Sequence, residues 1–181
     1  FFETSDNISS RQVIYEEGAT VNGFNVYIYN GYLYYGAWSE DYGWYFKYTK
    51  TEIDKNKNYR ATLVYNKYNN NFIGYLNEEK ISEVTGVTGM DSHSGEAGIG
   101  LNYSGTIFEN GSDNYTGQYF KGTVYEVRNF QNRSLSLSEI NNMPIGSLTG
   151  SESGLVGLWY VDDTTTNTLK DFSGNGNEGS I

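Results

Sequence analysis

The chain has 181 residues, which is enough for one domain with a sizeable core. Its 12 Lys and Arg against 22 Asp and Glu give a net charge of −10, which argues against nucleic acid and anionic membranes as partners. The absence of Cys excludes disulfides, thiolate catalysis and thiolate metal sites. No apolar run reaches the ~18 residues of a membrane span, so we expect no membrane insertion.

Aromatic residues make up 17% of the chain, with 18 Tyr, 22 Gly and a single Pro. This composition favours β-sheets joined by tight turns, because aromatic side chains fit a pleated surface. The acidic charge and the lack of Cys favour an extracellular or cell-surface protein of bacterial type. The opening Phe1-Phe2 is typical of a mature or excised polypeptide.

The first half of the chain contains six predicted strands, recognised by alternation and by aromatic content. Asn30-Gly31 separates the second and third of them, and this dipeptide predicts a type I′ hairpin turn. A polar turn is expected from Ala37 to Gly43. The strands are expected at Arg11–Tyr15, Phe24–Tyr29, Tyr32–Gly36, Trp44–Tyr48, Tyr59–Tyr65 and Phe72–Leu76.

The second half contains fewer regular elements. We expect irregular structure over 81–98, a short strand at Gly98–Tyr103, a long polar loop over 104–118 and a strand at Phe120–Phe130. Ser136 and Glu139 form a capping box, which predicts a helix over Ser136–Asn142, stopped by Pro144. Short strands without βαβ alternation predict an all-β fold, an antiparallel two-sheet jelly-roll sandwich with one short helix.

The stretch from Gly154 to Ile181 organises the rest of the chain. It holds an apolar strand, Leu155–Val161, then Asp162 and Asp163, and then the run Asp171–Gly179, which is rich in Gly and Asn. These residues let the backbone curl with its oxygens inward, as a Ca²⁺ site requires. An Asx-rich turn that only reverses the chain explains the same residues.

This stretch, W-x-x-D-D…D-x-S-G-N-G-x-x-G, resembles the signature of laminin-G-like domains of the concanavalin A-like jelly-roll class. Asn58–Tyr65 with Phe72–Asn77 resembles the central hairpin of that family. Phe120–Arg128 with Leu135–Ile140 resembles its closing strand and helix. Together the matches cover most of the chain, and the resemblance implies a single domain over residues 1–181, with the usual domain-opening motif (154–181) at the C-terminal end.

Two features depart from the family pattern. Tyr125 stands where the family has an Asp that related glucanases use on calcium. The opening signature is displaced to the C-terminal end, and Phe1–Thr4 resembles the tail of a strand that should follow it. Either the fold is circularly permuted or the chain is a piece of a longer repeat-bearing protein. In the second case an open sheet edge is a template for strand addition and filament assembly.

The sequence offers no catalytic pattern. Glycosidases of this fold carry alternating acids on one strand, whereas Glu40 and Asp41 are adjacent in a predicted turn. His93, the only His, lies in a Ser/Gly loop, so neither a zinc site nor a catalytic triad is indicated. We therefore expect a protein that is not an enzyme.

The aromatic cluster between Tyr32 and Tyr45 is the best candidate for ligand binding, because sugar C–H faces stack on aromatic rings. About half of these rings must face the core. Trp38 and Tyr42 are expected to be exposed in the turn, although Trp38 could instead plug the end of the sandwich. The loop over 102–119 would form a second wall. The predicted ligand-binding residues are Trp38, Tyr42, Trp44, Asn110, Asp113 and Tyr115.

The resemblance implies a non-catalytic module that binds glycans or cell-surface polysaccharide, with a structural Ca²⁺ at Asp171. Asp162, Asn175 and Glu126 are the expected co-ligands. The alternative is a structural adhesin or filament subunit that self-associates by strand complementation.

Overall fold

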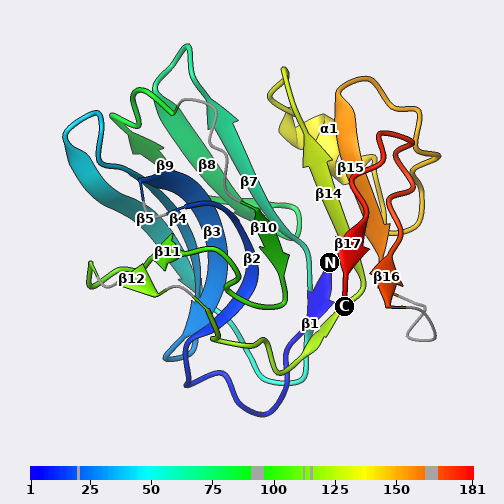
Figure 1. Ribbon diagram of the computed structural model, residues 1–181, viewed down its shortest axis with the longest axis horizontal. Helices are drawn as coiled ribbons and strands as arrows, with labels where there is room; N and C mark the ends of the chain where they lie inside the picture. Colours follow the sequence, from blue (N-terminus) through cyan, green and yellow to red (C-terminus); the bar gives the residue numbers. More distant parts are fainter. Residues whose placement is uncertain (20, 91–95, 112, 115, 162–166) are drawn as a thin grey trace.

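The computed structural model describes residues 1–19, 21–90, 96–111, 113–114, 116–161 and 167–181, and only the backbone at 113–114. The fold is all-β and antiparallel, as predicted (Figure 1). The first strands are β1 (Phe2–Glu3), β2 (Gln12–Gly18), β3 (Asn22–Tyr29), β4 (Tyr32–Ser39), β5 (Trp44–Glu52), β6 (Asn58–Tyr59), β7 (Ala61–Asn66), β8 (Asn71–Leu76) and β9 (Glu79–Thr85). The later strands are β10 (Ala97–Ile99), β11 (Thr106–Ile107), β12 (Asp113–Asn114), β13 (Thr123–Val124), β14 (Glu126–Phe130), β15 (Leu155–Tyr160), β16 (Thr168–Leu169) and β17 (Gly179–Ser180).

One layer is a five-stranded sheet in the order β10-β2-β3-β4-β5. The β3–β4 hairpin turns at Asn30 and Gly31, whose φ values of 50° and 79° confirm the predicted turn. The side chains of this sheet alternate between an inner face, with Val26, Ile28 and Leu33, and an outer face, with Tyr27 and Tyr34.

The second layer consists of three short ladders, β9-β8-β7, β6-β1-β13 and β14-β15. Strand β6 runs on into β7, and β13 runs on into β14, so the three ladders follow one another across this layer. The two layers enclose the main core. Tyr35 of the first layer is fully buried and donates its hydroxyl hydrogen to the backbone oxygen of Tyr75 in β8, 2.6 Å away.

Strands β7 and β14 each pair on one side only. β7 pairs with β8, β14 pairs with β15, and the facing edges of β7 and β14 have no ladder partner in the described chain. β1, with two residues, lies between β6 and β13, the strands that precede β7 and β14 in the chain. The second layer is therefore open between β7 and β14 (Figure 1).

The C-terminal stretch is built into the second layer. β15 pairs with β14 in register from Glu126↔Tyr160 to Asn129↔Gly157, and Asp171 adds a bridge to Trp159. The predicted short helix is confirmed as α1 (Leu137–Asn141), with Ser136 as N-cap and both bonds of the capping box.

Strand β9 extends into the stretch from residue 81 onward that the sequence predicts to be irregular. β9 lies at the outer edge of β7-β8-β9, where charged side chains protect an exposed strand from unwanted pairing. Among the described residues, no helix has the length and apolar character that crossing a bilayer requires.

Candidate functional site

Hydrogen bonds to the Asp171 carboxylate hold the loop that begins at this residue. Asp171 is 5% exposed, and its Oδ1 accepts from the backbone N–H groups of Leu158 (3.0 Å) and Ser173 (2.8 Å). Its Oδ2 accepts from the Ser173 hydroxyl (2.9 Å) and the Asn177 N–H (2.9 Å). Burial alone would raise the pKa of this carboxyl, but the hydrogen bonds outweigh it and lower the pKa.

These residues do not fit a calcium ion as they are arranged. Both Asp171 oxygens face hydrogen-bond donors, and the Asn175 amide nitrogen donates to the Leu155 carbonyl oxygen at 3.2 Å. Glu126 pairs with Arg128 and accepts from the Gly146 N–H (2.7 Å). No group of three or more His, Cys, Asp or Glu side chains suited to a metal occurs within the described part of the chain. Asp162, the fourth predicted ligand, lies outside the described residues.

The prediction that Trp38 is exposed in a turn is wrong. β4 continues to Ser39, and Trp38 is completely buried. Its indole N–H donates to the backbone oxygen of Ala19 at 2.7 Å. Its ring covers Gly23, the register partner in β3, where an added Cβ would lie 2.5 Å from the ring. A glycine opposite the Trp makes room for the ring, so Trp38 is structural.

Tyr42 and Trp44 pack on a different segment. The Tyr42 ring covers Gly89, and the Trp44 indole N–H donates to the backbone oxygen of Thr88 at 3.0 Å. Tyr42 remains 46% exposed, whereas Trp44 is half-buried. These two predicted ligand residues therefore pack side by side against residues 86–90.

The loop over 102–119, which was predicted to form a second wall of the site, contacts β5 through Tyr45. The Tyr45 hydroxyl donates to the backbone oxygen of Gly111 at 3.2 Å, directly after the exposed Asn110. The side chain of Asp113 and all of Tyr115 lie outside the described residues. The loop is anchored by Phe108, which is fully buried, and by Glu109, whose carboxylate accepts from the Tyr27 hydroxyl (2.8 Å).

An aromatic platform covers the outer face of β3–β5, and we define it as Tyr27, Tyr32, Tyr34, Phe46 and Tyr48. Tyr27 and Tyr34 are buried and form its base, and they stack with centroids 4.7 Å apart and planes 10° apart. Phe46 and Tyr48 stack at 5.7 Å and 27°. Tyr48 is the most open member, with 42% of its surface exposed.

Lys50 completes the platform. Its ammonium lies 4.1 Å from the Tyr32 ring centroid and donates to the Tyr34 hydroxyl at 3.4 Å. That hydrogen bond raises the pKa of Lys50. The sequence prediction included Tyr32 and Tyr34 but missed Phe46, Tyr48 and Lys50. The period-two spacing of 46, 48 and 50 on one strand was the available signal.

A polar pocket adjoins the platform at Tyr32. It has a volume of about 400 Å³ and is lined by Asn30, Gly31, Tyr32, Glu52, Ile53 and Asp54. The Tyr32 hydroxyl donates to the Glu52 carboxylate at 3.2 Å and so joins the platform to the pocket. An aromatic surface that ends in carboxylate and amide groups can take a ligand with apolar faces and hydroxyl groups.

No protein-family model matches the sequence, and no curated protein matches it. The fold is similar to the crystal structure of a protein from Bacteroides ovatus that is named a "putative carbohydrate binding protein", with a TM-score of 0.71 and 19% identity. The match covers 98% of this chain and 49% of the other, so the chain spans about half the length of that structure. The similarity shows that the two chains share an all-β fold.

Proposed function

We propose that this chain is a non-catalytic carbohydrate-binding module of the laminin-G-like type, carried by an extracellular or cell-surface protein. The observation that carries the proposal is the accessible part of the aromatic platform, Tyr32, Phe46 and Tyr48, with its adjoining polar pocket. The fold similarity to a protein named for carbohydrate binding supports it. A sugar ring would stack on Tyr48 and Phe46, while Lys50, Glu52 and Asn30 would bind its hydroxyl groups.

The test is glycan binding by the purified chain and by Tyr48→Ala. A glycan array identifies the ligand, and calorimetry measures its affinity. One stacking ring contributes about 1 kcal/mol of binding free energy, so its loss should weaken binding about fivefold to tenfold. Tyr68→Ala is the matched control, because Tyr68 is 87% exposed in the β7–β8 turn and outside the platform. No binding by the unmodified chain, or equal losses in both variants, would refute the proposal.

A filament subunit is the second candidate, and the edges of β7 and β14 that have no ladder partner among the described residues favour it. Analytical ultracentrifugation separates the two functions. Ordered multimers that grow with protein concentration support strand exchange between copies, whereas a monomer at all concentrations refutes it.

A further inference from the structure

Lys50 places a positive charge on the aromatic platform that no carboxylate neutralises. Its ammonium group lies 4.1 Å from the Tyr32 ring centroid and 5.3 Å from that of Tyr34. Within the described part of the chain, no Asp or Glu forms an ion pair with it. Arg11, a cation near the same face, is already paired with Glu109 at 2.6 Å. The charge of Lys50 is therefore available to a ligand.

The position of this ammonium group is held before any ligand binds. Lys50 is in register with Tyr34 of β4, and its Nζ donates to the Tyr34 hydroxyl at 3.4 Å. A cation above an aromatic face, as here above Tyr32, is attracted by the negative face of the ring. Holding a long side chain in advance reduces the entropy cost of binding. Lys50 remains exposed, so an anion can reach it.

The neighbours of Lys50 on β5 determine what surrounds such an anion. Tyr48 and Glu52 each lie two residues from Lys50 on the same face, about 6.7 Å along the strand. Tyr48 stacks with Phe46 and is 42% exposed, so it can take the C–H face of a sugar ring. A sugar stacked on Tyr48 can therefore direct an anionic group toward Lys50.

The adjoining pocket is unfavourable for a second anion. Its lining includes Glu52 and Asp54, and both side chains are exposed. The Tyr32 hydroxyl donates to Glu52 and holds this carboxylate between the platform and the pocket. Like charges repel, and the net charge of −10 adds a long-range repulsion of polyanions. The pocket offers hydrogen-bond acceptors to hydroxyl groups, so it favours a neutral sugar.

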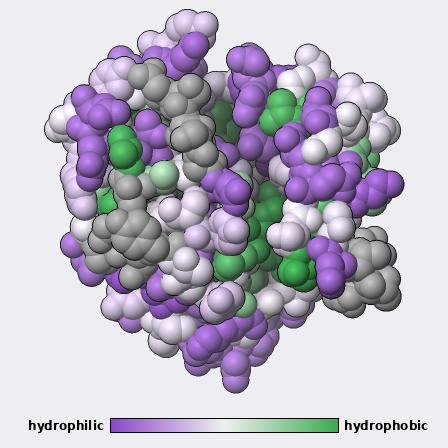
Figure 2. All heavy atoms as spheres, in the orientation of Figure 1, coloured by the Kyte–Doolittle hydropathy of each residue, from purple (hydrophilic) through white to green (hydrophobic). Residues whose placement is uncertain are grey.

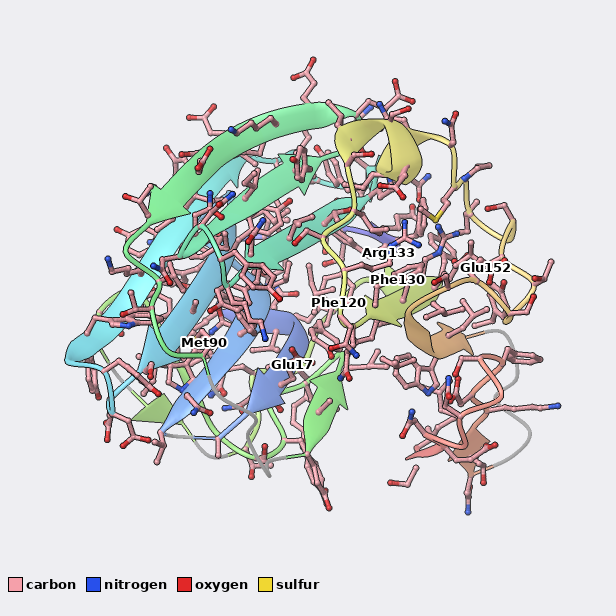
Figure 3. The ribbon with its side chains drawn as sticks, turned by 90° about the horizontal axis from the view of Figure 1, so that it is seen from above. Glu17, Met90, Phe120, Phe130, Arg133 and Glu152 are labelled. Carbon is pink, nitrogen blue, oxygen red and sulfur yellow. The ribbon has the colours of Figure 1, made fainter. Side chains whose placement is uncertain are left out.

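A larger hollow lies on the opposite face of the five-stranded sheet and has a different lining. It is a groove of about 970 Å³ between β7 and β14, with Phe24 and Val26 on its floor. Figure 2 shows hydrophobic residues in this hollow. In Figure 3, Met90 lies on the side of the sheet, and Phe130 and Arg133 lie across the groove. The hydroxyl groups of a glycan find more polar partners at the platform and its pocket than on this floor.

We propose that the platform binds glycans in which a sugar residue with one anionic group adjoins a neutral residue. The anionic group, a uronic acid carboxylate or a sulfate ester, binds Lys50, and the ring that bears it stacks on Tyr48. The neutral residue lies in the pocket, where Glu52 and Asp54 accept hydrogen bonds from its hydroxyl groups. This inference rests on the proposed carbohydrate binding and narrows it to one class of glycan.

A glycan array followed by calorimetry on the full chain tests the class. The array carries neutral oligosaccharides, hyaluronan tetrasaccharide, a lactosamine tetrasaccharide with one sulfate ester, and tetragalacturonate. It also carries carboxyl-reduced hyaluronan and the unsulfated lactosamine as uncharged counterparts. We expect hyaluronan or the sulfated glycan to bind most tightly, and its uncharged counterpart to bind at least about tenfold more weakly at low salt. The difference should shrink at ~0.5 M salt, which screens exposed charges.

Three variants locate the charge. Lys50→Met keeps an unbranched side chain over Tyr32, and it should weaken the anionic glycan about tenfold and its uncharged counterpart by less than about twofold. Lys170→Met is the control, because Lys170 also lies over a ring, 5.0 Å from the Phe172 centroid, but outside the platform. It should change neither affinity. Glu52→Gln keeps an acceptor for the Tyr32 hydroxyl, and tetragalacturonate should bind it at least about threefold more tightly than the parent.

Two kinds of result would overturn this inference and leave the proposed function intact. One is a neutral glycan or tetragalacturonate as the strongest binder on the array. The other is a change in Lys50→Met that is equal for the anionic glycan and its uncharged counterpart, because Lys50 would then only support the rings. An array on which no glycan binds would refute both this inference and the proposed function. Thermal unfolding of each variant checks that it is folded.

Discussion

At the residue scale, Glu16 is the most unusual ionisable group. It is fully buried in β2 opposite Asn25 of β3, which is also fully buried. Its Oε1 accepts from the N–H groups of Tyr103 (3.0 Å) and Ser104 (3.4 Å), but its Oε2 has no hydrogen-bond partner. Burial raises the pKa of Glu16 to about 7, and the two backbone hydrogen bonds oppose that rise. The folded state therefore binds this proton more tightly than the unfolded chain does.

We predict that Glu16 makes the fold less stable as pH rises. Because the folded pKa of about 7 exceeds the ordinary 4.5, the folded state holds this proton more tightly. The stabilisation is complete below about pH 4.5 and is lost between there and pH 7. Glu16→Gln retains an acceptor and cannot ionise, so the variant should gain stability over the parent between pH 5 and 8. Urea unfolding of both chains measures this, and parallel pH profiles would contradict it.

Asp171 gives a second residue-scale prediction. In Asp171→Asn the amide group replaces Oδ2, so it faces the donors of Ser173 and Asn177. Leaving a buried N–H without an acceptor should cost about 1–3 kcal/mol of unfolding free energy, measured by urea denaturation. Because the carboxylate is already satisfied, Ca²⁺ and EDTA should leave the melting temperature of the parent chain unchanged. A rise in melting temperature with Ca²⁺ would instead indicate a bound ion.

At the scale of elements, α1 depends on its cap. The Ser136 hydroxyl accepts from the Glu139 N–H at 3.3 Å, and the Glu139 carboxylate accepts from the Ser136 N–H at 2.8 Å. The bonds from Ser136 lower the pKa of Glu139. Arg60 then ties the helix to the second layer by donating to the Ile140 carbonyl oxygen at 2.9 Å.

We expect Ser136→Ala to reduce the free energy of unfolding by about 1 kcal/mol, because the first turn of α1 loses its acceptor. Ser138→Ala, two residues later and on the exposed side of the helix, should change it by less than about 0.5 kcal/mol. Thermal and urea unfolding of both variants measure the difference. Equal effects would mean that the cap does not hold the helix.

At the scale of the whole molecule, the short-range patterns of the sequence were reliable. Asn30-Gly31 turned where predicted, and the capping box at Ser136 began the helix. The C-terminal strand Leu155–Tyr160 formed within one residue of the expected bounds. Each of these features depends on a few neighbouring residues, so local backbone preference decides it.

Long-range features were not accessible in this way. The sequence predicted that half of the aromatic cluster faces the core, but not that Trp38 is buried and Tyr48 is exposed on the same face of the sheet. That outcome depends on Gly23 in the neighbouring strand and on the register between strands. The calcium prediction rested on the oxygens of Asp171, and the sequence does not show which hydrogen-bond donors reach those oxygens.

The sequence by itself determined an acidic, tyrosine-rich, antiparallel β protein with defined turns and one capped helix, because composition and near-neighbour patterns encode those properties. Only the tertiary structure decided which rings form the platform, and that β7 and β14 line one groove without pairing. The platform depends on the register of β3, β4 and β5, and the open part of the layer lies between strands about 60 residues apart that do not pair with each other, so no local pattern specifies either feature.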